Sequence, residues 1–486
     1  MRGLPIYIWN VHHAPFLVRV ATLLNVVEES GEWPQEVLAA YVTMIPKSSG
    51  GTRPQDQRPI TVLDVLYRVW AKGVVLNWAP VLQREYPGLA AMGFRAQSGT
   101  LHLAQLLSDL IELQRRRKQQ LWLVSFDVEK CFPSLPWWAI FGVLTRAGVP
   151  QRIVRCFRQL YANLRHRFRF GQVDGTEWSM TNGLAQGCPA SPDLLNVLFE
   201  PFHRWAASQS VGVPVLDTHV ASTSFADDLV LLGTDLRELV LLVDAYHSWC
   251  RLLGVTLHLG KTQLWSLQAR AGERVVLPLT SGPLELEVRA TFRVVGVELG
   301  ATERVATAVH FAQRLSKALL SGRRLTGLDV PAPLAAHLWR TAVLPQALYG
   351  CELRRLTPSQ LCPLAVQCRR MVARKAPLAL SHYAASEVLH GPPLGACAVV
   401  DPRREVLVRR LKWLAVIANM PGLVGAVHRL LATTPGPSWR EHSGALAAAL
   451  AEVQWSVSRN LASPRGCRWP LVEPELSFRG EVFLEP

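Results

Sequence analysis

The sequence contains no pair of cysteines at C-x-x-C spacing, although it has nine cysteines in 486 residues. Because the count is odd and the positions are scattered, we expect neither a disulfide framework nor a zinc knuckle or ribbon. No apolar run reaches the ~18 residues that a membrane span needs. His12, His13 and Arg19 interrupt any signal-peptide core near the N-terminus. These absences favour an intracellular protein of a reducing compartment, with no membrane partner.

Lysine is scarce, with 8 residues against 44 arginines. Lys and Arg together total 52 against 37 Asp and Glu, which gives a net charge of +15. Since Arg binds phosphate bidentately and stacks on bases, this surplus favours a nucleic-acid partner. A GC-rich genome, whose codons favour Arg over Lys, would explain the ratio of the two residues but not the net charge. The length predicts about three domains or subdomains.

The first 120 residues are predicted to be helices around a basic loop. Apolar spacing indicates helices over Leu17–Glu29, Ile60–Leu82 and Leu101–Leu113. A strand-like run over residues 37–44 precedes a Ser/Gly/Pro/Arg loop. The basic run Arg115–Lys118 could serve nuclear import, but a solvated helix end is the favoured interpretation.

From residue 120 the pattern changes to strands mixed with helices, and beyond about 301 it is helical. Strands are expected over Leu121–Phe126 and in the strand-rich segment Val275–Leu299, and a hairpin turn at Val173–Gly175. Helices are expected over residues 137–148, 152–163, 192–208 and 235–253. Pro-rich breaks at residues 331–333, 391–393 and 434–437 are candidate linkers.

Two adjacent carboxylates, Asp227 and Asp228, interrupt an otherwise apolar segment in Phe225-Ala-Asp-Asp-Leu-Val-Leu-Leu. In a regular strand they would point to opposite faces, and unpaired burial would be costly. A tight hairpin with both at its tip, and a divalent cation between them, would solve the geometry and the electrostatics. An ordinary Asp-Asp turn at the surface is the alternative.

A second carboxylate, Asp127, follows an apolar strand directly, in Ser125-Phe-Asp-Val-Glu-Lys-Cys-Phe132. If the two strands are neighbours, Asp127 would face Asp227 and Asp228. Hard oxygen ligands of this kind hold Mg²⁺, and two such ions suit in-line phosphoryl displacement. A simple strand-end cap is the alternative for Asp127.

A Gly/Pro loop, Gly183-Leu-Ala-Gln-Gly-Cys-Pro-Ala-Ser-Pro192, is predicted to open a helix, with Ser191 as N-cap and Pro192 at the first helical position. Backbone could approach a ligand closely at Gly187. The segment Gly254–Thr262 imitates a phosphate-binding loop, but its spacing is one residue too long.

Two basic stretches are candidates for nucleic-acid binding, one rich in Arg and aromatics and one on the helices expected after residue 301. An amphipathic helix with a basic outer face explains the first stretch equally well. The candidate side chains are Arg155, Arg158 and Arg165 in the first stretch and Arg314, Lys317, Arg323 and Arg324 in the second.

In this order the Asp127 motif, the Gly183–Pro192 loop and the Asp227-Asp228 motif resemble the palm of reverse transcriptases from non-LTR (LINE-type) retrotransposons. Further blocks occur in the expected order over roughly residues 15–370. They are Gly31–Pro34, Ile45–Lys47, Arg58–Ile60, Met92–Arg95, Gly254–Leu257 with Lys261-Thr262, Val295–Val297 and Leu348–Gly350. The family usually has Asn where this chain has His258.

The resemblance implies an α+β right-hand polymerase fold. Its parts would be fingers and N-terminal helices over 1–120, a palm with an antiparallel sheet and interleaved finger elements over 121–300, a helical thumb over 301–370, and a helical C-terminal region of unknown role over 371–486. It implies an RNA-directed DNA polymerase that joins dNTPs to a DNA primer on an RNA template, with two Mg²⁺ or possible Mn²⁺ ions.

The resemblance also implies residue roles. The metal ligands would be Asp127, Asp227, Asp228 and the Val128 carbonyl. The nucleotide would contact Lys47, Arg58, Phe132, Gln186 and Gly187, and Phe132 would exclude a 2′-hydroxyl. Lys261 would be a general acid that protonates the leaving pyrophosphate.

Other functions stay open at this point. Because the chain begins close to the fingers, we expect it to be a fragment of an element or a lone polymerase open reading frame, with an endonuclease or another element-encoded module as a missing partner. A catalytically inactive nucleic-acid-binding relic is the alternative function, and a maturase-like or telomerase-like enzyme would share the palm. A nuclear location follows from the resemblance only.

Overall fold

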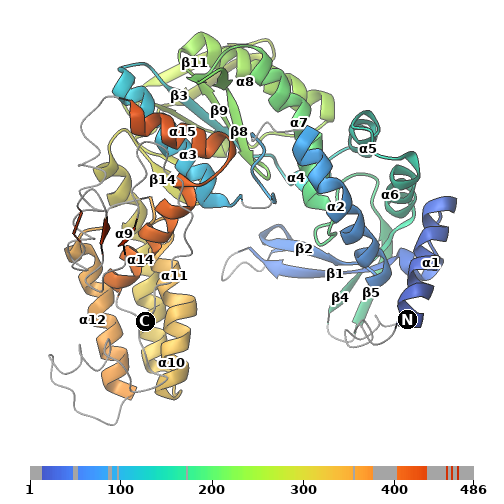
Figure 1. The fold of residues 1–486 in the computed structure, drawn as a ribbon. Coiled ribbons are helices and arrows are strands. Elements are labelled where there is room, and N and C mark those ends of the chain that lie inside the picture. The colour runs from blue at the N-terminus through green and yellow to red at the C-terminus, as the bar shows by residue number, and fades with distance from the viewer. Residues whose placement is uncertain are drawn as a thin grey trace.

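The computed structural model describes residues 14–47, 53–85, 90–95, 98–170, 173–353, 356–375 and 402–434, with two-residue strands at 456–457, 461–462 and 468–469. Figure 1 shows an arch in which one limb carries the N-terminal helices and a first sheet, and the other carries the helices that follow residue 301. A second sheet joins the limbs at the top. This is the α+β arrangement of fingers, palm and thumb that the resemblance implies.

The fingers sheet combines strands from two distant parts of the chain. Its order is β2-β1-β4-β5, with β1 antiparallel to β2 and parallel to β4. The strands are β1 (Ala39–Pro46), β2 (Gln57–Val62), β4 (Arg165–Phe170) and β5 (Val173–Ser179). This sheet therefore joins strands that lie before and after β3 (Trp122–Phe126) in the sequence.

Two expectations in this sheet are wrong. Helical apolar spacing predicts that Ile60–Val62 begin a helix, but these residues pair with β1, because Ile, Thr and Val favour a pleated surface. The helix starts at Val65, where Asp64 Oδ1 accepts the Leu66 N–H at 2.7 Å. The turn expected at Val173–Gly175 lies inside β5, with Asp174 opposite Arg169.

Helices cover the fingers sheet and supply an aromatic core. The cluster of Trp33, Tyr67, Trp70 and Phe157 has ring centroids 5.0–5.9 Å apart. Trp33 Nε1 donates to the Cys156 carbonyl at 3.0 Å, which satisfies its polar atom. The helices are α1 (Ala14–Ser30), α2 (Val65–Glu85), α5 (Trp137–Arg146) and α6 (Gln151–Asn163).

The palm sheet has the antiparallel order β10-β3-β9-β8. In β9, Leu229 and Leu231 enter one core cluster, while Val230 and Leu232 enter another. Both faces of this strand are thus buried, which explains its unbroken apolar run. The strands are β3 (Trp122–Phe126), β8 (Ser222–Phe225), β9 (Asp228–Gly233) and β10 (Gln263–Ser266).

Helices from the whole chain cover the palm sheet. One face packs on α7 (Ser191–Ser208) and α8 (Leu236–Leu253), and the other on α3 (Thr100–Arg117) and α15 (Gly422–Thr433). The division at residue 120 therefore separates α3 from the sheet that it covers. Ser191 is not the N-cap of α7 but its first residue, with its Oγ donating to the Ala185 carbonyl at 2.9 Å.

Short elements complete the palm. Three hairpins are formed by β6 (Val213–Val215) with β7 (Thr218–Val220), β11 (Arg274–Leu279) with β12 (Gly282–Glu287), and β13 (Phe292–Val294) with β14 (Val297–Leu299). The helical turn α4 (Cys131–Ser134) follows Asp127.

The thumb is helical and has its own core, which includes the fully buried Trp339 and Leu344. It comprises α9 (Glu303–Gly327), α10 (Ala332–Leu338), a π-helical turn at Trp339–Val343, α11 (Leu344–Leu348) and α12 (Pro358–Lys375). The break expected at 331–333 falls at the start of α10. Those at 391–393 and 435–437 lie outside the described residues.

The described C-terminal helices dock onto both palm and thumb. In α14 (Pro402–Ala418), Val406 belongs to the thumb core, whereas Ile417 belongs to a palm core. The carbonyls of Leu431 in α15 and of Thr434 directly after it accept from Arg116 Nη1 at 3.0 and 3.3 Å. Arg116 is therefore held in the fold, whereas Arg115 and Lys118 are exposed at the end of α3, as the favoured interpretation expects.

Within the described residues, no single helix is long and apolar enough to span a membrane, although the bent pair Val408–Ile417 and Gly422–Leu431 meets the length and composition criteria together.

Candidate active site

The adjacent carboxylates lie at a hairpin tip, as the sequence predicts. Phe225 pairs with Asp228, which leaves Ala226 and Asp227 as the two turn residues. Ala226 has φ +57°, the positive value that tight two-residue hairpin turns require. Asp227 therefore projects from the turn and Asp228 from the first position of β9.

Strand register brings Asp127 to the same place. β3 and β9 pair up to Phe126 and Leu229, so the next position sets Asp127 opposite Asp228. On the other side of β3, Lys261 Nζ donates to Asp127 Oδ2 at 2.7 Å. The three predicted carboxylates and the predicted lysine thus share the end of one sheet.

These charges perturb one another. Partial burial, and then the charges of Asp227 and Asp127, raise the pKa of Asp228 to about 6, although Lys261 acts in the opposite direction. Burial also raises the pKa of Asp227, with Asp127 adding to the effect and Arg58 and Lys261 opposing it. Burial therefore disfavours the charged form of both carboxylates, and the neighbouring carboxylates add to this effect.

The Val128 carbonyl faces this cluster. Val128 forms a bridge with Leu257, flanked by hydrogen bonds from Glu129 N to the Thr256 carbonyl and from His258 N to the Asp127 carbonyl, both at 2.8 Å. In this antiparallel pattern the N–H and C=O of Val128 point away from Leu257. That direction is the side of the sheet on which β9 and Asp227 lie.

The donor set fits a divalent cation. Burial, and then repulsion from neighbouring carboxylates, raises the pKa of Asp227 and of Asp228, and a bound cation would oppose both effects. Carboxylates and a backbone carbonyl are the oxygen ligands that Mg²⁺ prefers. Among the described residues, however, no group of three or more His, Cys, Asp or Glu side chains stands in the geometry of a completed metal site. Phosphate oxygens of a substrate would have to complete it.

Residues predicted to contact the nucleotide approach from the fingers and from the loop before α7. Thr61 N in β2 donates to the Gln186 carbonyl at 2.6 Å, and a Cβ on Gly187 would lie 2.4 Å from the Thr61 carbonyl oxygen. Arg58 is exposed on β2, and Lys47 is exposed directly after the end of β1. Arg58 is near enough to lower the pKa of Asp227.

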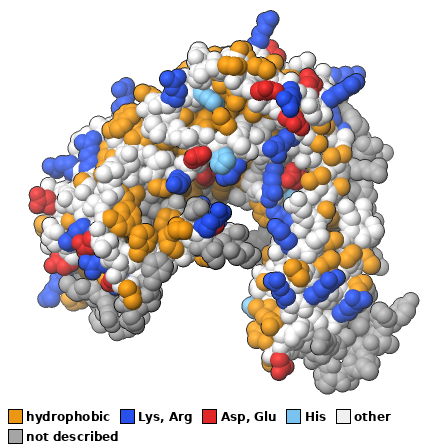
Figure 2. All heavy atoms as spheres, turned by 180° about the vertical axis from the view of Figure 1, so that it is seen from behind, with side chains coloured by type: hydrophobic (Ala, Val, Ile, Leu, Met, Phe, Trp, Pro, Cys, Tyr) orange, Lys and Arg blue, Asp and Glu red, His pale blue; other side chains and the backbone are white. Residues whose placement is uncertain are grey.

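Phe132 is half-buried in α4, and its carbonyl accepts the Leu184 N–H at 2.7 Å. This bond connects the last residue of the Asp127 motif to the Gly183–Pro192 loop. The structure therefore brings the predicted catalytic and nucleotide-contacting residues onto adjoining elements. Figure 2 shows a hollow between the two limbs, with acidic, basic and histidine side chains together at its top.

The structure does not bring the fingers arginines to this cluster. Arg155 Nη2 and Arg165 Nη2 donate to the carbonyls of Glu29 and Gln35, both at 3.4 Å, and Arg158 lies over the Phe141 ring at 5.6 Å. Figure 1 places α6 on the outer side of the fingers, beside α1. For Arg155 and Arg158 the structure favours the alternative interpretation, a basic outer face.

The thumb cations divide into two groups. Arg314 is engaged in the fold, because its Nη2 donates to the Gly296 carbonyl at 2.7 Å and its guanidinium lies over Tyr349 at 4.5 Å. Lys317, Arg323 and Arg324 are exposed on α9. Basic side chains follow the inner edge of the thumb limb (Figure 2).

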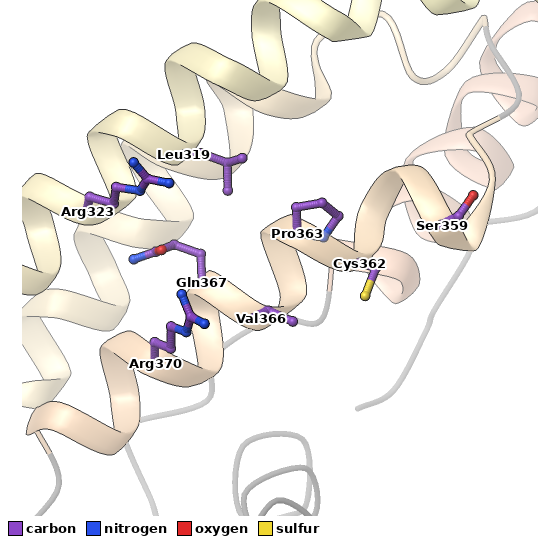
Figure 3. A pocket seen from close by; sticks show the side chains of 8 residues that line it. All are labelled: Leu319, Arg323, Ser359, Cys362, Pro363, Val366, Gln367 and Arg370. Atoms are coloured by element: carbon purple, nitrogen blue, oxygen red, sulfur yellow. The ribbon is translucent and has the colours of Figure 1, made fainter.

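A groove of about 540 Å³ runs between α9 and α12 of the thumb. Figure 3 shows Arg323 on one side of it and Arg370 on the other, with Gln367 between them. The groove lies in the thumb, apart from the carboxylates of the palm. Its other lining residues are Leu319, Ser359, Cys362, Pro363 and Val366.

Residues 45–299 match the family model described as reverse transcriptase (RNA-dependent DNA polymerase). The chain belongs to the reverse transcriptase family. Its matched segment contains every predicted catalytic, metal and nucleotide residue, from Lys47 to Lys261.

Relatives of this reverse transcriptase come from non-LTR elements. It is 25% identical over 344 residues to a Pol polyprotein from the type-2 retrotransposable element R2DM of Drosophila melanogaster, covering 68% of this chain and 31% of that protein. It is 26% identical over 349 residues to a Pol polyprotein from the type-1 element R2 of Popillia japonica, covering 68% and 46%. The chain thus spans less than half the length of either relative.

Among solved structures, apo telomerase from Candida tropicalis aligns with a TM-score of 0.42 at 11% identity, covering 85% of this chain and 74% of that chain.

Sequence reasoning missed a set of buried polar residues behind the hairpin. Asn196, Glu200 and His203 lie on α7 and are 7%, 3% and 3% exposed. Their spacing of four and three residues on a helix that is otherwise mostly apolar was the available signal.

Proposed function

We propose that this chain extends a DNA primer on an RNA template, as the polymerase of a retrotransposable element. The observation that carries the proposal is the register that sets Asp127 opposite Asp228, beside Asp227 and Lys261. Family membership supports the same reaction.

In the proposed reaction, the primer 3′-oxygen attacks the α-phosphorus of a dNTP. The bond to the bridging oxygen breaks, and pyrophosphate leaves. Asp127, Asp227, Asp228 and the Val128 carbonyl would hold two Mg²⁺ or Mn²⁺ ions. When bound, such ions neutralise phosphate charge and favour deprotonation of the attacking hydroxyl.

The side chains of this chain supply position and charge. Lys47 and Arg58 extend from the fingers hairpin, from which cations can reach a triphosphate. Gln186 and Gly187 are held against the same hairpin and would form the floor of the nucleotide pocket. Phe132 would pack against the deoxyribose, where a 2′-hydroxyl would collide with the ring.

Lys261 has a more specific role than the sequence implied. Its Nζ is bound to Asp127 at 2.7 Å, so it balances part of the carboxylate charge before any substrate arrives. Proton donation from Lys261 to pyrophosphate stays a prediction. A location in the nucleus and an endonuclease or other element-encoded module as a partner also stay predictions.

The catalytically inactive alternative has no observation in its favour, since all three carboxylates are present at one sheet end. Primer extension on an RNA template with Mg²⁺ and dNTPs tests the proposal, with wild type beside Asp227→Ala. Asp217→Ala is a matched control, because Asp217 is an exposed aspartate in the turn of another hairpin.

We expect extension by wild type and by Asp217→Ala, and none by Asp227→Ala, with duplex binding retained by all three proteins. Duplex binding without extension by wild type would contradict the proposal and favour the inactive alternative.

A further inference from the structure

The buried face of α7 presents polar groups to the back of the catalytic hairpin. His203 lies between two serines of β8, with Nδ1 2.8 Å from Ser222 Oγ and Nε2 3.0 Å from Ser224 Oγ. Ser222 and Ser224 share one face of the strand, since side chains alternate along it. The turn with Asp227 begins two residues after Ser224.

His203 is suited to hold β8 in a fixed position. Burial, and then the charge of Arg95, lower the pKa of His203 to about 3. The ring is therefore neutral at physiological pH, with one nitrogen donating and one accepting. Hydroxyl groups can fill either role, so both bonds form with a single tautomer.

Asn196 holds the hairpin by a second route. Its Nδ2 donates to the Gly93 carbonyl at 2.7 Å in a buried setting. A Cβ on Gly93 would lie 2.4 Å from Ala226 N, so the backbone at Gly93 lies directly against the turn. The same segment pairs with β8, because Met92 N donates to the Ser224 carbonyl at 2.7 Å.

An ion pair lies between these two anchors. Arg95 Nη2 and Glu200 Oε2 are 3.5 Å apart, and both side chains are largely buried. Arg95 belongs to the segment that Asn196 binds, and Glu200 lies on α7 between Asn196 and His203. The contact therefore reinforces the attachment of residues 90–95 to α7.

We propose that Asn196 and His203 are positioning residues for nucleotidyl transfer, which fix the Ala226-Asp227 turn from behind through Gly93 and β8. This inference rests on the proposed polymerase function. Neither side chain need touch substrate; each acts through the backbone that carries Asp227 and Asp228.

The test compares His203→Leu and Asn196→Leu with wild type and with Glu238→Gln. Glu238 Oε2 accepts from Gly212 N, Thr234 N and Thr234 Oγ1, so its replacement also breaks a polar network. That network adjoins Gly233, which lies five residues from Asp228 along β9. At the rise per residue of a strand, Gly233 and Asp228 are about 17 Å apart. His203→Gln, which can keep one serine bond, is the conservative variant.

We expect the single-turnover rate of one dNMP incorporation to fall about 10- to 100-fold in both leucine variants, because small displacements of reacting groups cost this much. Duplex affinity should change less than twofold, and His203→Gln should recover part of the rate. Glu238→Gln should lower the melting temperature and leave the rate per folded molecule unchanged. Wild-type rates in both folded leucine variants would overturn the inference.

Amide hydrogen exchange supplies a readout that needs no activity. Exchange of residues 224–229 should be faster in both leucine variants than in wild type or Glu238→Gln. Unchanged exchange there would contradict the inference. Absence of incorporation by wild type would instead contradict the proposed function, and the exchange comparison would still decide the positioning role.

Discussion

At the residue scale, the charge of the site is set by three carboxylates and the few cations beside them. Lys261 is bound to Asp127, whereas Asp228, the next carboxylate along the register, keeps a pKa raised to about 6 by partial burial and its acidic neighbours. The apolar segments around Asp127, Asp227 and Asp228 predicted the three carboxylates, whereas only the family resemblance implied Lys261. Neither could predict that Lys261 is paired, since Asp127 is 134 positions away.

Lys261→Met and Lys261→Arg separate the two roles of this lysine. If Lys261 balances charge on Asp127, the Met variant should lose at least about tenfold in single-nucleotide incorporation, and the Arg variant should stay within a few-fold of wild type. A general-acid role would instead cost the Arg variant about 10²-fold or more, because Arg is a poor proton donor. The rate of pyrophosphate release under single-turnover conditions measures the difference.

The buried His203 predicts a dependence of stability on pH. Its pKa is about 3 in the folded protein and near 6.5 when unfolded, so only the unfolded state takes up its proton between these values. Stability should therefore fall as pH decreases from 6.5 toward 3, by up to about 1.4 kcal/mol per pH unit from this residue.

Denaturant unfolding of wild type and His203→Gln between pH 7.5 and 5 measures that contribution as a difference. The comparison of the two proteins is needed because Glu200, whose pKa is raised to about 7, makes both of them more stable as pH falls, opposite to the effect of His203. Parallel stability curves for the two proteins would contradict a neutral buried His203.

At the element scale, sequence patterns predicted the palm better than the fingers. β3 and the β8–β9 hairpin were recognisable because apolar runs end at carboxylates. Ile60–Val62 was misassigned because apolar residues at helical spacing continue from it into α2, and only pairing with β1 shows it to be a strand. Arg314 was expected to bind nucleic acid, but tertiary contacts with Gly296 and Tyr349 engage it.

Gly187 lies in the contact between the fingers and the palm, and Gly187→Ala should weaken that contact. Its φ of +122° disfavours a side chain, and the new Cβ would lie 2.4 Å from the Thr61 carbonyl oxygen. We expect a loss of stability on the order of 1–3 kcal/mol and a large rise in the dNTP concentration for half-maximal rate. Gly148→Ala is the matched control, because Gly148 has φ +79° with nothing within 4 Å of the added Cβ. Equal kinetics in the two variants would contradict the assigned contact.

At the scale of the whole molecule, the described C-terminal helices connect the palm to the thumb. α14 contributes Val406 to the thumb core and Ile417 to the palm core. Trp413 Nε1 also donates to Gln105 Oε1 on α3 at 2.8 Å. The sequence predicted helices here but not their docking, because docking depends on α3, which lies some 300 residues earlier in the chain.

Ile417→Ala tests whether this helical pair is integral to the fold. Ile417 is fully buried, so its truncation should lower the free energy of unfolding by about 2–5 kcal/mol. Val416 is 48% exposed, and Val416→Ala should change that free energy by less than about 0.5 kcal/mol. Similar unfolding curves for both variants would show that α14 contributes little to the core.

The single-turnover rate of adding one dNMP to a primer on an RNA template, measured against Mg²⁺ concentration, tests the proposed polymerase site most directly. Wild type should add the nucleotide in a Mg²⁺-dependent manner. Asp127→Asn, Asp227→Asn and Asp228→Asn should each lose at least about 10³-fold in this rate and retain duplex affinity. A folded asparagine variant that matched wild type, or a wild type that bound duplex and added nothing, would contradict the proposed site.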